Sequence, residues 1–422
     1  MGTRLRSAGN MPKPLVEING RPMIDYLLEH VSRAGIRDVV LLTGFDAGKI
    51  DDYCGNGSKW GLSLRTVAEK APAGTGGAVL QALDGLHPRF LVLYADTIFD
   101  FDIERMTDYH EKFSPDATLF LHPNDHPFDS DLVEADDSDK ILKIHPYPHP
   151  AGADLPNLVN AAIYIVERAS LARLKNVPQK PDFAKHLFPL MLEQGMFLKG
   201  YRSPEYVKDA GTPERLEKVG RDLLYGKVAQ RSLKNPVPAI FIDRDGTLVE
   251  ERSHIKTPDE LVLLPGVGPA LAKLNAGKYR TVLVTNQPVV ARGECDERGL
   301  KKIHNRLESL LGADGAYLDA IYYCPHHPDK GFPGERPELK IDCECRKPKT
   351  GLLERAKTEL NIDFPNSWMM GDSTTDVMTA QRAGVKSILV GTGHGGRDGK
   401  WQVKPDFERP SLAEAVELIS RW

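Results

Sequence analysis

The chain has few cysteines and almost no net charge. Five cysteines occur in 422 residues, and 55 lysines and arginines stand against 59 aspartates and glutamates, which gives a formal net charge of −4. A strongly basic patch or stripe is the usual mark of a nucleic-acid-binding domain, and this composition gives no sign of one. We therefore expect no nucleic-acid partner.

Long apolar runs are also lacking. No stretch approaches the roughly 20 residues needed to cross a membrane, and the N-terminus lacks the charged-then-apolar layout of a signal peptide. We therefore expect no membrane association and a location in the reducing cytoplasm. Hydrophobic residues still make up 41% of the chain, enough for real cores, and 422 residues suffice for two or three ordinary domains.

Two aspartates follow a short apolar run in the stretch PAIFIDRDGTL, residues 238–248. The run has the character of a buried parallel strand, and ligands of open α/β sheets collect at the carboxyl ends of strands. Alternation along the backbone puts Asp243 and Asp245 on the same side, where they can share a cation and a phosphate. Taken alone, DRDG is equally well a solvated turn, because Asp-Gly is a common turn pair.

Three further motifs follow in order, each placing polar residues at the end of a strand or in a turn. They are TVLVTNQ with Thr285 and Asn286, CRKP with Arg346 and Lys347, and SWMMGDSTTD with Asp372 and Asp376. A nucleophilic carboxylate, a hydroxyl–amide pair, a lysine and a final acid are what phosphoryl transfer through an aspartyl-phosphate needs. The ordered series resembles the haloacid dehalogenase (HAD) superfamily of phosphatases over roughly the C-terminal half of the chain.

This resemblance implies catalytic roles for Asp243, Asp245, Thr285 and Lys347 and a substrate-binding role for Asn286. Asp243 would attack phosphorus, and Asp245 would protonate the leaving alkoxide and then deprotonate the attacking water. Thr285 and Asn286 would hold phosphate oxygens. Lys347 would balance the charge on the nucleophile and on the phosphoryl group.

The same resemblance implies a magnesium site. Asp243, Asp372 and the backbone carbonyl of Asp245 would hold Mg²⁺, a hard ion that prefers oxygen ligands. Asp376 would orient the loop or a neighbouring basic group.

Three of the five cysteines crowd into one stretch, together with two histidines. Cys324 and His326 form C-x-H, sixteen residues intervene (327–342), and Cys343 and Cys345 form C-x-C. Three thiolates and one imidazole complete a closed tetrahedral zinc site, which would hold the loop and do no chemistry. The alternatives are unligated buried thiols or a disulfide, and a disulfide is disfavoured in a chain with no secretory signal. His327 is a spare imidazole that would face the substrate.

The spacing of the phosphatase motifs leaves no room for a large lid. Asp243 and Thr285 are 42 residues apart, and a strand, a turn and a helix expected near 267–276 use up that length. Substrate choice must then come from short loops. The zinc loop before CRKP, with TNQ and ARG upstream, resembles the D-glycero-D-manno-heptose 1,7-bisphosphate phosphatase group, whose near relatives are the histidinol-phosphate phosphatases. Arg292 and Arg346 would then bind substrate.

One departure from that group affects the substrate assignment. The chain has TNQPVVARGE where the group usually has a Ser-Gly pair after TNQ. The change alters the loop over the phosphate. Histidinol phosphate or another small phosphomonoester is therefore the alternative substrate.

The N-terminal half begins as an alternating α/β domain. Apolar residues recur at helical spacing over 23–31, and DVVLLT follows as a buried strand. Ahead of them lie Gly2, Thr3, Arg4 and Lys13. Glycine lets backbone amides approach a phosphate closely, and the two basic side chains would neutralise a triphosphate. Taken alone, GTRL is better explained as an ordinary basic loop.

Further motifs complete the pattern of the N-terminal half. They are a glycine-rich turn containing Gly76 and Gly77, a strand ending on Asp96, a later strand with Asn160 near its start, and Asp209 before a Gly-Thr-Pro helix entry. Together they resemble the sugar-phosphate nucleotidylyltransferases over about residues 1–225, most closely the branch that activates heptose or mannose. This resemblance implies a sugar 1-phosphate and a nucleoside triphosphate as substrates, with release of pyrophosphate.

The nucleotidylyltransferase resemblance also assigns roles. Gly2, Thr3 and Arg4 would form the triphosphate loop, and Lys13 would steady the transferring α-phosphate. The remaining residues divide between the nucleotide, the sugar and the metal: Gly76 and Gly77 against base and ribose, Asn160 on the sugar, and Asp96 and Asp209 on Mg²⁺.

This family normally begins with a strand and an Ala-Gly-Gly turn ahead of the Gly-Thr-Arg-Leu element. Neither precedes GTRL here, and the missing strand would be a central member of a parallel sheet. We therefore expect either a true reading frame that starts upstream of Met1 or an N-terminal half that binds nucleotide poorly.

The expected architecture is two Rossmann-like α/β domains with mainly parallel sheets, over residues 1–225 and 238–422. The stretch between them loses periodicity and carries prolines, and we take 226–237 as a linker. The C-terminal segment has a helical apolar pattern that would close the phosphatase sheet. The combined expectation is a bifunctional enzyme that makes a nucleotide-activated heptose, with GDP the favoured carrier and ADP second. The alternative is a phosphatase whose N-terminal half senses a ligand without catalysis.

Overall fold

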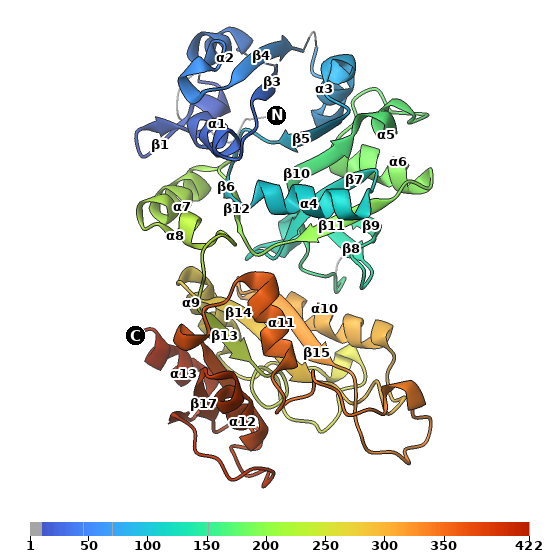
Figure 1. Ribbon diagram of the computed structural model, residues 1–422, viewed down its shortest axis with the longest axis vertical. Helices are drawn as coiled ribbons and strands as arrows, with labels where there is room; N and C mark the ends of the chain where they lie inside the picture. The colour runs from blue at the N-terminus through green and yellow to red at the C-terminus, as the bar shows by residue number, and fades with distance from the viewer. Residues whose placement is uncertain (1–10, 45, 70, 151, 422) are drawn as a thin grey trace. The chain divides into compact units, whose positions relative to one another are not determined.

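The computed structural model describes residues 11–44, 46–69, 71–150 and 152–421 (Figure 1). The chain divides into two compact units. The first comprises Met1–His122, Asp131–Tyr147 and Val159–Leu233, and the second comprises Pro123–Ser130, Pro148–Leu158 and Lys234–Trp422.

The first unit alternates short helices and strands. Its strands are β1 (Glu17–Ile18), β2 (Arg21–Pro22), β3 (Asp38–Thr43), β4 (Ser63–Ala68), β5 (Arg89–Leu93), β6 (Thr97–Asp100), β7 (Ala117–His122), β8 (Leu132–Ala135), β9 (Ile141–His145), β10 (Val159–Glu167), β11 (Leu198–Arg202) and β12 (Tyr206–Asp209). Its α-helices are α1 (Met23–Arg33), α2 (Ala47–Cys54), α3 (Thr75–Ala82), α4 (Ile103–Phe113), α5 (Arg168–Ala172), α6 (Phe188–Glu193), α7 (Pro213–Leu224) and α8 (Lys227–Gln230).

The main sheet of this unit is mixed. It has the order β11-β7-β10-β8-β9, and β5 joins it by pairing with β10. β7 and β11 are parallel, whereas β10 is antiparallel to β5, β7 and β8. β3 and β4 form a separate parallel pair, and β6 and β12 a separate antiparallel pair. Among the described residues of this unit, the parallel character expected of both domains is therefore found in two ladders.

Local sequence explains where two of its helices lie. α1 buries Met23, Ile24, Leu27, Leu28 and Val31 on one face, which is the apolar spacing noted in the sequence. α7 begins at the Gly-Thr-Pro entry, because Pro213 suits the first helical turn and the Thr212 side chain accepts a hydrogen bond from Arg215 N.

The stretch 226–237 is partly folded. α8 occupies Lys227–Gln230, and Val228 and Leu233 are buried. The division between the units falls after Leu233. The apolar side chains at these two positions explain why this segment packs although its sequence lacks helical periodicity.

The second unit is a parallel sheet between two layers of helices. Its strands are β13 (Ala239–Ile242), β14 (Arg280–Asn286), β15 (Ala320–Cys324), β16 (Trp368–Gly371), β17 (Lys386–Val390) and β18 (Phe407–Arg409). Its helices are α9 (Val267–Ala276), α10 (Glu297–Ala313), α11 (Gly351–Leu360), α12 (Thr374–Ala383) and α13 (Leu412–Ile419). The order is β15-β14-β13-β16-β17-β18, and every ladder is parallel.

Alternation along β13 divides its side chains between two cores. Ile240 and Ile242 join the core built with α9, α10 and α13, while Ala239 and Phe241 join the core built with α11 and α12. This double burial is what the unbroken apolar run AIFI indicates. α9 coincides with the helix expected between the first two motifs, and α13 lies where a closing helix is expected.

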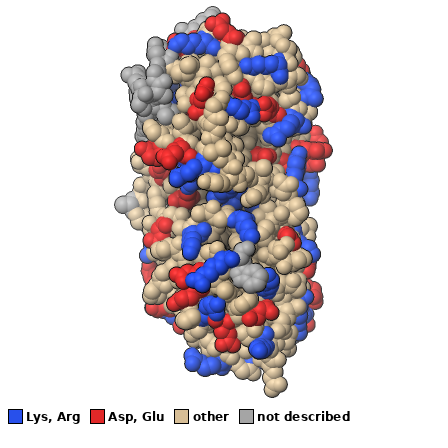
Figure 2. All heavy atoms as spheres, turned by 90° about the vertical axis from the view of Figure 1, so that its left-hand side faces the viewer, with Lys and Arg blue, Asp and Glu red and all other residues tan. Residues whose placement is uncertain are grey.

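The charge on the surface and the length of the helices bear on the expectations from composition. Acidic and basic side chains are interspersed over the face shown in Figure 2. Among the residues that the structure describes, no helix combines the length and the apolar character needed to cross a membrane.

Candidate functional site

The strand ends of the second unit bring the phosphatase motifs together. Asp243 directly follows the central strand β13, Thr285 lies near the end of β14, and Asp372 directly follows β16. β13 pairs with β14 on one side and β16 on the other, so the three residues share the carboxyl edge of the sheet. Asp243 N donates a hydrogen bond to Met370 O at 3.0 Å, which fixes the start of the motif loop on the neighbouring strand.

Lys347 is a buried cation held between two carboxylates. Its Nζ lies 2.9 Å from Asp243 Oδ1 and 2.6 Å from Asp376 Oδ1, and its side chain is 2% exposed. Burial disfavours the ammonium, but Asp243 and Asp376 outweigh that effect and raise the pKa of Lys347 above its usual value. Lys347 therefore stays charged beside the expected nucleophile.

The carboxylates around Lys347 carry more negative charge than one ammonium balances. Burial raises the pKa of Asp243 to about 7 against the attraction of Lys347, and Asp376 and Asp245 add to the increase. Burial, helped by Asp243, also raises the pKa of Asp372 to about 8. Carboxylate oxygens of Asp243, Asp372 and Asp376 all lie within 4.8 Å of one another. An oxygen-rich cluster of this kind fits a hard divalent cation such as Mg²⁺.

The DRDG turn brings the backbone close to that cluster. Gly246 has φ +72°, and a Cβ added there would overlap the Asp372 carboxylate. Asp372 in turn accepts a hydrogen bond from His394 N at 2.6 Å. The Asp245 carboxylate is not part of the three-acid group and instead accepts hydrogen bonds from Arg244 and Gln287. Its expected share in a metal site, through the backbone carbonyl, stays a prediction.

The Asn286 side chain binds the protein backbone. Its Nδ2 donates to Lys347 O at 3.0 Å, and its Oδ1 accepts from Lys347 N at 3.0 Å. These two bonds position the lysine. Thr285 is buried, and its Oγ1 accepts a hydrogen bond from Gln287 Nε2 at 3.0 Å. Phosphate contacts for Thr285 and Asn286 remain predictions, and the role of Asn286 in holding Lys347 was missed in the sequence.

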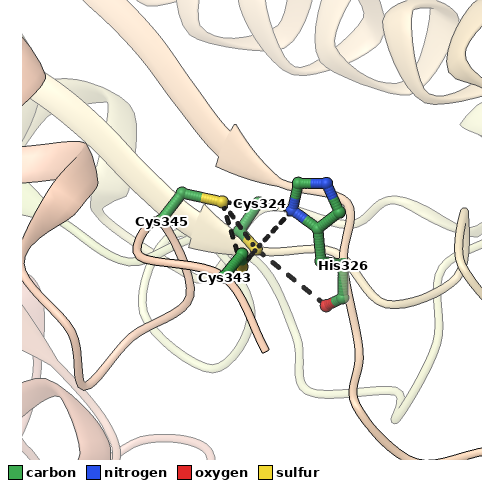
Figure 3. A group of neighbouring side chains, drawn as sticks. All are labelled: Cys324, His326, Cys343 and Cys345. Atoms are coloured by element: carbon green, nitrogen blue, oxygen red, sulfur yellow. Dashed lines mark hydrogen bonds between the residues drawn. The ribbon is translucent and has the colours of Figure 1, made fainter. Parts of the chain in front are cut away.

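The four zinc candidates converge on one point (Figure 3). The three sulfur atoms lie 3.2 to 3.5 Å apart: Cys324–Cys345 3.2 Å, Cys343–Cys345 3.3 Å and Cys324–Cys343 3.5 Å. His326 Nδ1 lies 3.2 Å from Cys345 Sγ and 3.7 Å from Cys324 Sγ. A disulfide holds its sulfurs about 2.05 Å apart, whereas zinc–sulfur bonds of about 2.3 Å in a tetrahedron place sulfurs nearly 4 Å apart. The group therefore fits a tetrahedral metal ion.

The thiols of this group influence one another. Hydrogen bonding from Cys324, with further donors at Cys343 and His326, lowers the pKa of Cys345 to about 5. The same bond raises the pKa of Cys324, and burial adds to that increase. One thiolate is thus already favoured beside two thiols, which is the state from which a cation displaces protons.

Basic side chains from two loops contact His326 and Phe332. Arg346 Nη1 donates to His326 O at 3.2 Å, and Arg292 and Lys340 both lie against the Phe332 ring, 4.4 Å and 4.5 Å from its centroid. Burial, followed by the charge of Arg346, lowers the pKa of His327 to about 4, so its imidazole is neutral. Lys340 and Phe332 were missed in the sequence because neither belongs to a motif.

The N-terminal site is less complete. Lys13 Nζ lies 3.2 Å from Asp96 Oδ2, which joins two of the predicted residues. Asp209 forms an ion pair with Arg215 and accepts a hydrogen bond from Gly211 N at 2.6 Å. Asp96 and Asp209 are linked through the backbone, since Ala210 N donates to Asp96 O at 2.9 Å.

Of the other residues predicted to bind nucleotide or sugar in this unit, some already form hydrogen bonds within the protein and the rest lie outside the described residues. The amides of Gly76 and Gly77 donate to Pro181 O at 3.0 Å and 3.2 Å, and a Cβ on Gly76 would overlap the Leu187 side chain. Asn160 Oδ1 accepts from Ala162 N at 3.2 Å, where β10 has a register shift. The remaining predicted residues, Gly2, Thr3 and Arg4, lie outside the described residues.

A large cavity adjoins Lys13 and Asp96. Its volume is about 980 Å³, and its apolar lining comes largely from α1, β3 and β5. Among the residues that the structure describes, β3 forms a ladder only with β4, and β5 only with β10. The apolar side chains of β5 are only half-buried. The cavity therefore lies between two strands, β3 and β5, that do not pair with each other among the described residues.

Comparisons with known proteins divide the chain in the same way. A family model described as nucleotidyl transferase matches residues 1–225, and a HAD-hydrolase-like model matches residues 344–415. The D-glycero-β-D-manno-heptose-1,7-bisphosphate 7-phosphatase of Haemophilus ducreyi is 38% identical over 184 residues, which cover 43% of this chain and 98% of that protein.

Two solved structures also match parts of the chain. The D,D-heptose 1,7-bisphosphate phosphatase of B. bronchiseptica, complexed with magnesium and phosphate, is 32% identical with a TM-score of 0.39, over 44% of this chain and 98% of that one. HddC of Yersinia pseudotuberculosis is 23% identical with a TM-score of 0.46, over 53% of this chain and 95% of that one. With the family match over residues 1–225 and the relative matched over nearly its full length, the chain belongs to the nucleotidyl transferase family and also to the HAD-type heptose-bisphosphate 7-phosphatases.

Proposed function

We propose that the second unit hydrolyses the 7-phosphate of D-glycero-D-manno-heptose 1,7-bisphosphate through an aspartyl-phosphate. The observation that carries this proposal is the contact of Asp243 Oδ1 with the buried Lys347 Nζ at 2.9 Å, at the centre of a parallel sheet edge. A carboxylate beside a fixed cation can approach a phosphate dianion, because the cation offsets the repulsion between the two anions.

The reaction needs two carboxylates in different roles. Asp243 attacks phosphorus while the bond to the leaving alkoxide breaks, and Asp245 gives that alkoxide its proton. Asp245 then takes a proton from water as the water attacks phosphorus and the bond to Asp243 breaks. Magnesium bound by Asp243, Asp372 and the Asp245 carbonyl would offset the charge of the phosphoryl oxygens. The four-residue zinc site would hold the loop that leads into Arg346 and Lys347.

The loops beside the site suit a substrate with a second phosphate. Arg292 lies over Phe332 and Arg346 beside His326, so these loops present two guanidinium groups. Lys340 is already paired with Glu335 at 3.4 Å. A sugar bisphosphate presents one phosphate to Asp243 and keeps the other, and a guanidinium binds a phosphate in a bidentate manner. Histidinol phosphate carries only one phosphate and offers no second phosphate to these two arginines. The basic cluster therefore favours the bisphosphate.

For the first unit we propose transfer of a nucleotidyl group, GMP in preference to AMP, to the heptose 1-phosphate that the second unit produces. Lys13 beside Asp96 supplies a cation and a metal-binding carboxylate at one place. In this proposal Mg²⁺ is held by Asp96 and Asp209, and the sugar by Asn160. Thiolate zinc ligands persist in a reducing compartment, so we place both reactions in the cytoplasm.

A second candidate for the first unit is ligand sensing without catalysis. It is favoured by the Gly76 and Gly77 amides, which donate to Pro181 O, and by the cavity beside Lys13. Both features leave the expected nucleotide site incomplete among the described residues.

Product analysis tests these proposals. Each tube contains the purified chain, Mg²⁺, heptose 1,7-bisphosphate and one nucleoside triphosphate, and the release of phosphate and pyrophosphate is measured. We expect phosphate in every tube and pyrophosphate with GTP. Phosphate without pyrophosphate in every tube would leave the sensing role for the first unit. Faster phosphate release from histidinol phosphate than from the bisphosphate would overturn the substrate assignment.

A further inference from the structure

Arg244 stands between the two catalytic aspartates in sequence and is buried, with a side chain 1% exposed. Its Nε lies 3.1 Å from Asp245 Oδ1, and its Nη2 lies 3.0 Å from each of Asp245 Oδ1 and Oδ2. Two donor nitrogens of one planar guanidinium thus hold one carboxylate. Such a fork fixes both the position and the plane of the acid.

Gln287 completes a hydrogen-bonded ring with Arg244 and Asp245. Its Oε1 accepts from Arg244 Nη2 at 2.8 Å, and its Nε2 donates to Asp245 Oδ2 at 2.8 Å. The same Nε2 lies 3.0 Å from Thr285 Oγ1, a hydroxyl expected to contact phosphate. Both oxygens of Asp245 are therefore engaged by groups of this chain that are themselves buried.

The burial of Arg244 is costly for stability. A buried guanidinium loses its hydration, and its Nη1 finds no hydrogen-bond partner among the described residues. The charge of Arg244 also acts on His304. Burial lowers the pKa of His304 to about 3, and Arg244 adds to this effect, so the His304 imidazole stays neutral. An apolar side chain of similar size at position 244 would avoid these costs, which points to a role other than stability.

The hydrogen-bonded ring of Arg244, Asp245 and Gln287 also keeps the Asp245 carboxylate away from the three-acid group. Asp243, Asp372 and Asp376 already gather their carboxylates within 4.8 Å of one another. A fourth carboxylate free to rotate beside them would be drawn to any cation that they bind. The ring holds Asp245 by its oxygens and keeps it out of that group.

We propose that Arg244 and Gln287 are positioning residues that hold the Asp245 carboxyl in place for proton transfer. This inference rests on the proposed aspartyl-phosphate chemistry. Asp245 gives its proton to the leaving alkoxide in the first step and takes one from water in the second. The link from Gln287 to Thr285 couples the position of the acid to the phosphate site.

Leaving groups of different basicity separate positioning from folding. A sugar alkoxide needs a proton as it leaves, whereas p-nitrophenolate leaves without one. Both substrates form the same aspartyl-phosphate, whose hydrolysis needs Asp245 to deprotonate water. Loss of the ring should therefore slow the first step for a sugar phosphate and only the second step for p-nitrophenyl phosphate.

The test uses Arg244→Met and Gln287→Met, which keep volume and remove the hydrogen bonds. With heptose 1,7-bisphosphate, kcat should fall about 10²-fold for Arg244→Met and about 10-fold for Gln287→Met, with KM changed less than about threefold. With p-nitrophenyl phosphate in a stopped-flow instrument, both variants should release a first equivalent of p-nitrophenol at close to the wild-type rate. A slow steady state should follow.

The controls keep this test separable from the proposed function. Arg280→Met removes a fully buried arginine at the start of β14, away from the carboxyl edge, and should leave the ratio of the two substrates unchanged. Asp243→Asn should abolish the burst. If Asp243→Asn stays active, the proposed function fails. If Asp243→Asn is inactive while both ring variants slow the first turnover of both substrates equally, only the positioning role fails. Should Arg244→Met not fold, Gln287→Met alone decides the question.

Discussion

The two units offer a comparison between a site along the edge of a six-stranded parallel sheet and a site at the end of a two-stranded antiparallel ladder. In the second unit, Asp243, Thr285 and Asp372 share one edge of a continuous parallel sheet, and Lys347 reaches into the group they form. In the first unit, Lys13 contacts Asp96, but Asp209 pairs with Arg215. Strand pairing fixes the distance between neighbouring strand ends. In the first unit the β6–β12 ladder does this for Asp96 and Asp209, whereas Lys13 lies on a separate short helix, Lys13–Leu15. The residues of the first site should therefore be held less firmly in position than those of the second.

The largest effect should come from Asp243→Asn. Removing the attacking carboxylate should lower phosphate release about 10⁴-fold or more, as expected for the loss of a covalent nucleophile. Pyrophosphate release from GTP and heptose 1-phosphate should be unchanged, because that reaction uses the other unit. A parallel fall in both activities would show that the two sites do not act separately.

Lys13→Ala should produce the reverse pattern. Loss of a cation at the transferring phosphate should lower pyrophosphate release about 10²-fold, while phosphate release stays at the wild-type rate. Lys112→Ala, which removes an exposed lysine of α4, is the matched control. An unchanged rate of pyrophosphate release in Lys13→Ala would remove this residue from the site.

Loss of zinc should affect only the second unit. Cys343→Ser should lower bound zinc, measured by mass spectrometry, from about one ion per chain and should reduce phosphate release, because Arg346 and Lys347 directly follow the metal loop. Melting of the second unit should begin several degrees lower. Cys295 lies in the same unit but outside the four-residue group, so the Cys295→Ser variant should bind as much zinc as the wild type. Full zinc occupancy in Cys343→Ser would contradict the four-ligand site.

The smallest effect concerns pH. The pKa values of Asp243 and Asp372 lie at about 7 and about 8 in the folded chain without bound Mg²⁺, above the ordinary value of 3.8. The folded state then holds more protons than the unfolded chain. The stability that these two carboxyl groups contribute is therefore fully present below pH 3.8 and is lost as pH rises towards 8. Between pH 6.5 and 8, the free energy of unfolding should fall by at most about 1.4 kcal/mol per pH unit for each extra proton.

Urea unfolding in magnesium-free buffer with zinc retained measures that slope. His304 and His327, whose pKa values are lowered to about 3 and about 4, act in the opposite direction, and their effect fades as pH rises above 6.5, the ordinary pKa of histidine. Burial lowers the pKa of Lys227 to about 8, so this lysine also acts in the opposite direction at the upper end of the window. Asp372→Asn should flatten the slope. Added Mg²⁺ should stabilise the wild type more at pH 8 than at pH 6.5, because it binds ionised carboxylates. Equal stabilisation at both values would contradict the acid cluster as the metal site.

The sequence predicted those features that depend on spacing within the chain. The run AIFI, the helix at 267–276 and the C-x-H and C-x-C pairs lie in the structure where their patterns place them. Features that depend on distant contacts were missed. Nothing local indicates that Arg244 is buried, that Asn286 binds the backbone of Lys347, or that β10 pairs in an antiparallel manner.

The cavity between β3 and β5 has a consequence for the binding of extended peptides. Each of these strands presents an edge that forms no ladder among the described residues, and strand edges accept extended segments of other molecules. Pairing of that kind joins uncharged amide groups, so added salt should weaken it little. An extended apolar peptide bound at either edge should therefore stay bound as salt is raised and should be released by dilution.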